Sequence, residues 1–319
     1  MTEEIRIHGE PLEKFITKEE YYEEDVVPTL PIDFSEYNPE NIVVWDKYTE
    51  IGEERGDLER AIKRGTFPYL VESEKGQGKT LLVHTICKEN KIALVTMPLG
   101  SGTTDKDLIG TKEINRNGTV FNLGLLPRGI EVANEYGHAL IYGDEANAQD
   151  HDIQKVWNSI CDGRRYIVAN GKMYKLKEGC KLSIVWTINP VTYAGVNTLT
   201  EDIRSRFIGR VWQYPTEDQL KKVINWEGFS VNDMFIQEPL LKLAQDIHAL
   251  RSKGEVDYAL SVRDIMQFIS YLKELKSSRD LSKASITSAL RNVFLIKYSD
   301  ETERELIKVR MNDTFDVVI

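Results

Sequence analysis

The 319-residue sequence predicts an α/β fold, in which helices sandwich a parallel sheet, followed by a smaller all-helical domain. Short apolar runs alternate with stretches of helical periodicity, as the crossover connections between parallel strands require. Asn-Gly pairs occur at 117–118 and 170–171, each between two short runs of residues that favour strands. They predict two inserted β-hairpins. From Thr216 onward the sequence shows helical spacing of Leu, Ile, Val and Phe.

These patterns divide the chain into three expected parts. Residues 1–41 mix acidic clusters with prolines and predict an extended N-terminal arm, which either wraps a neighbouring molecule or is a solvated tail. Residues 42–215 form the expected α/β domain, with a helix at 53–64, a second helix that begins after Thr80 and runs to about Glu89, and strands at 69–71, 91–97, 138–145 and 182–188. Residues 216–319 form the expected helical domain, with helices at 217–226, 238–253, 261–276, 281–297 and 301–310.

The composition is that of a globular protein, with 41% hydrophobic and 29% charged residues. No apolar run reaches the roughly 20 residues of a membrane span, and the acidic N-terminus lacks a signal segment, so we expect a cytoplasmic location. Cys87, Cys161 and Cys180 are scattered and lack a C-x-x-C spacing, which favours buried thiols over a disulfide framework or a metal site.

The net charge of −10 is concentrated at the N-terminal end. Residues 1–60 carry 18 acidic and 6 basic side chains, whereas the remainder carries 33 acidic and 35 basic ones. The rest of the chain is therefore nearly neutral, without the broad basic field that non-specific nucleic-acid binding favours.

The stretch between the first expected strand and its helix is a candidate phosphate-binding loop. Its strand–loop–helix order is that of a P-loop nucleotide site, although a Gly-rich turn is the alternative. Lys79 is expected to reach the β- and γ-phosphates and the Thr80 hydroxyl to hold Mg²⁺. Ser73 departs from the pattern G-x-x-x-x-G-K-[ST], which has Gly there. The residues expected at the nucleotide are Ser73, Glu74, Lys75, Gly76, Gln77, Gly78, Lys79, Thr80 and Leu81.

Two further expected strands end in polar side chains. Asp144 and Glu145 follow an apolar strand, at the edge where open α/β sheets bind ligands. Asp144 is expected in the Mg²⁺ shell and Glu145 as the general base for water, although such a pair also occurs in solvated loops. Asn189 ends the next strand and either holds the water or γ-phosphate, or only initiates a turn before Pro190. Arg263 lies in the first turn of a helix, where a cation opposes the helix dipole, so a role outside the helix competes with simple solvation.

Together these segments resemble the AAA+ ATPases, and more narrowly the MoxR-like and dynein-related branch, which includes gas-vesicle and Rubisco-activating ATPases and the McrB restriction motor. The resemblance covers about residues 42–276. The segments that carry it are S-E-K-G-Q-G-K-T at 73–80, D-L-I-G at 107–110, F-N-L-G-L-L-P-R-G at 121–129, I-Y-G-D-E-A-N at 141–147, V-W-N-S-I-C-D-G-R at 156–164, T-I-N-P at 187–190, R-S-R-F at 204–207 and S-V-R at 261–263.

The resemblance implies a role for each matching residue. Lys79 and Thr80 look like the Walker A pair, and Asp144 and Glu145 like the Walker B pair. Asn189 is similar to the sensor that aligns water, and Arg263 resembles the second sensor in the helical lid. Arg206 is similar to the arginine finger, with Arg204 as the less favoured candidate. Ile51 and Gly52 match the segment that contacts the base.

The resemblance also implies an activity: a homohexameric ring that hydrolyses Mg-ATP and remodels a protein client, often with a von Willebrand factor A-domain partner. A nucleic-acid-associated motor, resembling McrB and using GTP, is the alternative, and a nucleotide-gated structural ring that hydrolyses little is a third. The two hairpins would then face a pore. Phe121, Tyr166 and Tyr174 are candidates for gripping a client there, although aromatic residues in hairpins as often pack across strands.

Overall fold

The computed structural model describes residues 6–7, 10–11, 26–116, 118–190, 197–276 and 281–319. The chain divides into two compact units, which are described separately. Unit 1 comprises Met1–Val43, Arg60–Leu70 and Ile86–Gly209, and unit 2 comprises Val44–Glu59, Val71–Thr85 and Arg210–Ile319. The boundaries expected at 41/42 and 215/216 stay predictions. Every helix within the described ranges is too short or too polar to cross a bilayer.

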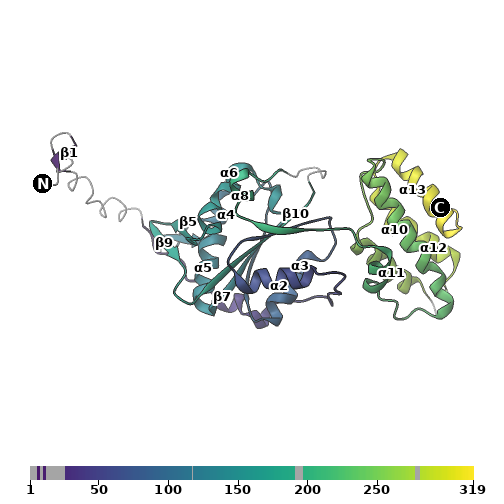
Figure 1. Cartoon of the computed structure of the whole chain (residues 1–319), viewed down its shortest axis with the longest axis horizontal. Coiled ribbons are helices and arrows are strands. Elements are labelled where there is room, and N and C mark those ends of the chain that lie inside the picture. The colour runs from purple at the N-terminus through teal and green to yellow at the C-terminus, as the bar shows by residue number, and fades with distance from the viewer. Residues whose placement is uncertain (1–5, 8–9, 12–25, 117, 191–196, 277–280) are drawn as a thin grey trace. The chain divides into compact units, whose positions relative to one another are not determined.

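A five-stranded parallel sheet forms the α/β part, as the sequence predicts (Figure 1). β7 pairs in parallel with β10 from His138↔Lys181 to Gly143↔Trp186, and β4 pairs with the other edge of β7 in the same direction. Neighbours in this sheet are not consecutive in the chain, so each connection crosses over a face of the sheet. In spatial order the strands are β11 (Ile208–Trp212), β3 (Tyr69–Ser73), β10 (Lys181–Ile188), β7 (His138–Asp144) and β4 (Ala93–Pro98).

Helices cover both faces of the central strands. Ile141 of β7 lies opposite Ile184 of β10, and this face packs against α5 (Leu125–Tyr136), where Gly129 approaches Ile141. The other face presents Ser183, whose hydroxyl donates to the carbonyl of Ile62 in α2 (Glu54–Arg64) at 2.6 Å. The register therefore assigns alternate residues of each strand to two different helix layers.

Both predicted hairpins are confirmed. β5 (Gly110–Asn115) pairs antiparallel with β6 (Gly118–Leu123), and β8 (Tyr166–Ala169) pairs antiparallel with β9 (Lys172–Lys175). Phe121 and Tyr174 are only 6% and 2% exposed, so both pack in the core and neither is available to grip a client. The remaining helices of this part are α3 (Lys79–Glu89), α4 (Asp105–Leu108), α6 (His151–Val156), α7 (Asn158–Cys161) and α8 (Glu201–Arg204).

The end of the expected N-terminal arm packs on its own unit. Leu30 N–H donates to the carbonyl of Phe121, and Phe121 N–H donates to the carbonyl of Pro28, both at 2.8 Å. Asn170, the turn residue of the second hairpin, donates to the carbonyl of Val27 at 2.7 Å. Residues 26–41 thus belong to the folded unit rather than to a free tail. They contain the 3₁₀ turns Phe34–Tyr37 and Pro39–Asn41. Two short strands precede them, β1 (Arg6–Ile7) and β2 (Glu10–Pro11), whereas residues 12–25 lie outside the described residues.

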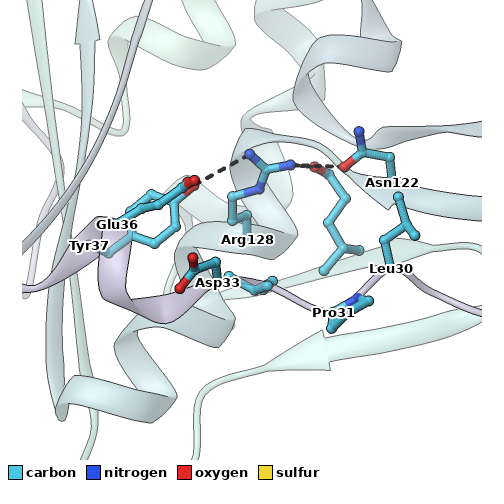
Figure 2. Close-up of a pocket in the computed structure, with 9 residues that line it drawn as sticks. Leu30, Pro31, Asp33, Glu36, Tyr37, Asn122 and Arg128 are labelled. Carbon is cyan, nitrogen blue, oxygen red and sulfur yellow. Dashed lines mark hydrogen bonds between the residues drawn. The ribbon is translucent and has the colours of Figure 1, made fainter.

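A hollow of about 320 Å³ lies between this N-terminal stretch and α5 (Figure 2). Arg128 of α5 lines it, and its guanidinium donates to Asn122 Oδ1 at 3.0 Å and to the Tyr37 hydroxyl at 3.4 Å. Asp33 and Glu36 line the same hollow. Arg128 therefore ties α5, the first hairpin and the N-terminal stretch together.

The helical part of unit 2 has one apolar core, as the sequence predicts, but its helix boundaries differ. Its helices are α9 (Glu217–Val223), α10 (Gln237–Ser252), α11 (Val262–Leu275), α12 (Lys283–Ala289) and α13 (Glu301–Phe315), and Figure 1 labels four of them. The single helix expected at 281–297 is wrong, because α12 continues as a π-turn at Leu290–Phe294 and a 3₁₀ turn at Leu295–Lys297. Val293, Phe294 and Leu295, at the junction of these two turns, are all buried in the helical core.

The close approach of α5 to the sheet predicts a specific cost for a side chain at position 129. A Cβ on Gly129 would lie 2.4 Å from Cδ1 of the fully buried Ile141. We expect Gly129→Ala to lower the free energy of unfolding by about 1–3 kcal/mol through overpacking, partly offset by the better helix propensity of alanine, about 1 kcal/mol. Urea unfolding followed by circular dichroism measures it. Gly163→Ala is the control, because no atom lies within 4 Å of a Cβ there. Equal midpoints for the two variants would contradict the packing described.

Candidate functional site

The phosphate loop connects β3 to α3 and has the backbone that its glycines permit. Gly76 and Gly78 have φ values of +73° and +82°, in the left-handed region that residues with a Cβ rarely adopt. Lys79, the first residue of α3, is only 8% exposed. Its ammonium donates to the carbonyls of Ser73 at 2.8 Å and Glu74 at 3.1 Å, and to the Ser73 hydroxyl at 3.0 Å. The lysine charge is thus held inside the loop by oxygens from the end of β3.

Side chains from two other segments of unit 2 lie against this loop. A Cβ on Gly76 would lie 2.7 Å from Ser261 Oγ and 3.1 Å from Cβ of Arg263, and one on Gly78 would lie 3.3 Å from the ring of Tyr48. Both glycines are therefore required by close packing as well as by φ. Tyr48 belongs to no motif, and only the tertiary contact identifies it.

The contact at Gly76 places Arg263 beside the phosphate loop, at the start of α11. The Asp264 carboxylate holds this first turn, accepting from Ser261 N–H at 2.8 Å, the Ser261 hydroxyl at 2.6 Å and the Tyr258 hydroxyl at 2.6 Å. Lys297 contacts the other carboxylate oxygen at 3.2 Å. The capping box thus orients the exposed Arg263, whose sensor role stays a prediction.

The Ile51–Gly52 segment, expected at the base, is fixed by backbone hydrogen bonds. Ile51 N–H donates to Glu54 Oε1 at 2.8 Å, and the Ile51 carbonyl accepts from the Gln219 amide at 2.8 Å. The Tyr48 hydroxyl donates to the same Glu54 oxygen at 3.0 Å. Burial, and next the Glu54 charge, raise the pKa of Tyr48 above its ordinary value, so its hydroxyl remains a donor.

The Walker B candidates lie at the end of β7 in unit 1. Asp144 is the last residue of the strand, and its Oδ1 accepts from the Tyr142 hydroxyl at 3.1 Å and from the Thr187 hydroxyl. Thr187 lies on the neighbouring strand β10, within the T-I-N-P segment that the sequence marked. Two hydroxyl donors therefore fix one carboxylate oxygen of Asp144.

Glu145 and Asn189 meet directly in the structure. Glu145 has a φ of +53°, which is strained for a residue with a side chain, and its N–H donates to Thr187 Oγ1 at 3.3 Å. The Asn189 amide donates to Glu145 Oε1 at 3.2 Å. Asn147, which is 1% exposed, exchanges two hydrogen bonds with the backbone of Asn189, at 2.7 and 3.3 Å. Asn147 lies in the marked segment I-Y-G-D-E-A-N, but its positioning role was missed, because a buried amide leaves no spacing signal.

The two finger candidates differ in their surroundings. Arg206 donates from Nη1 to the carbonyl of Asp202, and its Nε is buried without an acceptor among the described residues. Arg204 is exposed and donates to the carbonyl of Leu199 at 3.2 Å. The ring of Phe207 packs 4.7 Å from that of Trp186, which fixes the segment that carries both arginines. Which of them acts as a finger stays a prediction.

The donor set of the loop suits an anionic phosphate ligand. The loop supplies two side-chain donors, the Lys79 ammonium and the amide nitrogen of Gln77. The Gln77 nitrogen is buried and lacks an acceptor among the described residues. The Thr80 hydroxyl and the Asp144 carboxylate are oxygen ligands of the kind that Mg²⁺ prefers. By chemical type alone, the loop residues suit phosphate and the oxygens of Thr80 and Asp144 suit Mg²⁺. Gln77 is a further donor in the loop, whose role the sequence pattern does not specify.

The order of β3, the 73–80 loop and α3 at a parallel sheet is typical of P-loop NTPases. Residues 69–207 match the family model of the AAA domain (dynein-related subfamily), which runs from β3 to Phe207. This match supports an ATPase-type P-loop NTPase and agrees with the broader resemblance drawn from the sequence.

Alignments with similar proteins cover more of the chain than the family model does. Uncharacterized proteins of Staphylococcus aureus and Staphylococcus epidermidis are each 24% identical over 242 residues, covering 75% of this chain and 87% of the relative. Among solved structures, NtrX of Brucella abortus covers 88% of this chain and 67% of its own, at 14% identity and a TM-score of 0.50. The match to RuvB of Thermotoga maritima covers 80% of this chain and 73% of RuvB, at 12% identity and a TM-score of 0.48. The likeness to NtrX concerns the fold alone.

The buried amide of Asn147 yields a stability prediction. We expect Asn147→Ala to cost about 2–3 kcal/mol of unfolding free energy, because it removes the buried amide that bonds both the N–H and the carbonyl of Asn189. Asn134→Ala is the matched control, since Asn134 also bonds one backbone carbonyl and one backbone N–H, but at the surface. Its expected cost is about 1 kcal/mol or less. Chemical denaturation measures both, and a cost for Asn147→Ala no larger than that of the control would contradict this assignment.

Proposed function

We propose that this chain is a Mg²⁺-dependent ATPase of the AAA+ type, in which a nucleotide binds at the 73–80 loop and is hydrolysed with Glu145 as the base. The proposal is supported by the matched segment 69–207, by the buried Lys79 ammonium and by the fixed carboxylates at the end of β7. It requires Lys79 and Glu145 to act on one nucleotide.

In this proposal the loop binds and orients the phosphates. Backbone N–H groups around Gly76 and Gly78 donate to phosphate oxygens, and Lys79 supplies the compensating charge. Thr80 and Asp144 would hold Mg²⁺, which neutralises phosphate charge when bound. The hydroxyls of Tyr142 and Thr187 keep one Asp144 oxygen in hydrogen bonds, which leaves the carboxylate in a defined orientation for the metal.

The observation that carries hydrolysis, as distinct from binding, is the hydrogen bond between Asn189 and Glu145. A general base must be held in a fixed orientation, within hydrogen-bond reach of the water whose proton it takes. The Asn189 amide fixes Oε1 of Glu145, and Asn147 fixes Asn189 in turn. Glu145 then accepts the proton of the attacking water, which Asn189 helps to align.

We further propose a closed ring of six copies, in which Arg206 acts on the nucleotide of the adjacent copy. An interface that joins unlike surfaces head to tail closes into a ring when its rotation allows. The buried Nε of Arg206 has no acceptor among the described residues, as expected for a guanidinium whose full set of partners comes from elsewhere. The family resemblance adds a protein client and a partner with a von Willebrand factor A domain to this proposal.

Removal of the lysine charge tests nucleotide binding. We expect Lys79→Ala to weaken ATP binding by at least about 100-fold, because a charge-assisted contact to the phosphates is lost. Isothermal titration calorimetry with ATP and Mg²⁺ measures it. Lys253→Ala removes an exposed lysine at the end of α10 and serves as the control. Unchanged affinity of Lys79→Ala would remove the assignment of the phosphate loop.

Mixing of two inactive variants tests catalysis between copies. Glu145→Gln and Arg206→Ala should each bind ATP, yet turn over about 10³-fold more slowly, through loss of the base and of the transition-state charge. Mixed assemblies should regain part of the rate, because some interfaces combine an intact Glu145 with an intact Arg206 from the neighbour. Phosphate release measures this. A rate in mixtures equal to the sum of the separate variants would show that Arg206 does not act in trans.

The client class is tested with the Glu145→Gln variant, which holds ATP without hydrolysing it. Pull-down with this variant in the presence of ATP should retain a protein client that Lys79→Ala does not retain. Parallel turnover assays with ATP and GTP, each with and without DNA, separate this outcome from a nucleic-acid motor. Stimulation by DNA, with no ATP-dependent protein capture, would overturn the proposal of a protein client.

A further inference from the structure

Ser73 is the position at which this chain departs from the P-loop pattern, and the structure shows its hydroxyl in contact with the lysine that defines the loop. Ser73 is the last residue of β3 and is 2% exposed. Its Oγ lies 3.0 Å from Lys79 Nζ and 3.1 Å from the carbonyl oxygen of Glu74. Glycine at this position would leave the lysine without this partner.

The hydrogen-bond roles of the hydroxyl follow from its two neighbours. The Glu74 carbonyl can only accept, so the Ser73 hydroxyl donates its proton there. The lone pairs of Oγ then face Lys79, whose ammonium can only donate. The hydroxyl is therefore an oriented acceptor, with its negative end directed at the lysine charge.

This acceptor acts in addition to two backbone acceptors. Lys79 Nζ also donates to the carbonyls of Ser73 and Glu74, at 2.8 and 3.1 Å. Any residue at position 73 supplies its carbonyl, but only a hydroxyl side chain supplies the third oxygen. An ammonium has three N–H donors, so a phosphate oxygen that binds Lys79 must compete with these oxygens for a proton.

We propose that Ser73 is a positioning residue for Lys79, whose hydroxyl holds the ammonium back toward β3 and thereby weakens the binding of nucleoside di- and triphosphates. This inference rests on the proposed function of the loop. The hydroxyl does not touch the nucleotide, and it acts through the lysine alone. Nucleotide affinity is lower as a result, because a phosphate must displace the hydrogen bond between Ser73 and Lys79 before it binds the lysine.

Ser73→Ala removes the hydroxyl and leaves the backbone acceptors in place. We expect it to lower the dissociation constants of ATP and ADP by about five- to tenfold, the size of the net contribution of one ordinary hydrogen bond. AMP, which has no β-phosphate for Lys79 to bind, should show unchanged affinity.

Two further variants separate positioning from a structural effect. Ser73→Thr keeps a hydroxyl on a strand-compatible side chain and should restore the wild-type dissociation constants. Ser252→Ala removes an exposed hydroxyl that donates to the His248 carbonyl in α10, and it should leave all three affinities unchanged. Thermal unfolding of each variant checks that the fold is retained.

Isothermal titration with ATP, ADP and AMP distinguishes the outcomes. Tighter ATP and ADP binding by Ser73→Ala, with wild-type values for Ser73→Thr and unchanged AMP binding, supports the inference. Wild-type protein that binds ATP, with equal or weaker binding by Ser73→Ala, overturns the inference but leaves the proposed function standing. Absence of ATP binding by the wild type and by Ser73→Ala alike overturns both.

Discussion

The rest of the candidate site depends on a lysine charge held inside a loop of backbone. A buried ammonium needs several oxygen partners, and Lys79 finds them at the end of β3, in Ser73 and Glu74. This requirement fixes how the chain leaves the strand and enters α3. The left-handed glycines then let the loop pass close to Tyr48 and Ser261 without a clash. The buried lysine charge and the close packing of the loop therefore act together to define its path.

Sheet register fixes the second group of functional side chains. Tyr142, Asp144 and Thr187 lie on one face of two neighbouring parallel strands, because residues alternate between faces along a strand. A shift of one residue in the pairing of β7 and β10 would turn Asp144 to the other helix layer. Beyond the strand ends, the buried amide of Asn147 bonds the backbone of Asn189, and the Asn189 side chain bonds Glu145. Packing of the sheet and orientation of the proposed base are thus parts of one hydrogen-bonded structure.

In unit 2 a capped helix start lies against the phosphate loop. Asp264 accepts three hydrogen bonds and contacts Lys297, so it joins the first turn of α11 to the end of the 281–297 segment. The irregular π and 3₁₀ turns of that segment bury Phe294, whose ring stacks on Phe268 of α11 at 4.7 Å. The packing of the helical core therefore sets the position of Ser261 and Arg263 beside Gly76.

The sequence by itself determined the α/β class, the parallel sheet, both hairpins and the strand that ends in Asp144, and it marked the candidate phosphate loop, because apolar periodicity and turn residues act locally. It also marked Lys79, Glu145 and Asn189, because each of them follows the end of an apolar strand. Only the tertiary structure decided that Tyr48, Thr187 and Asn147 support them, and that Phe121 and Tyr174 belong to the core. It also decided that residues 26–41 pack on the hairpins and that the 281–297 helix is irregular. These features depend on contacts between residues far apart in the chain, and local propensity contains no information about the partner on the other side of such a contact.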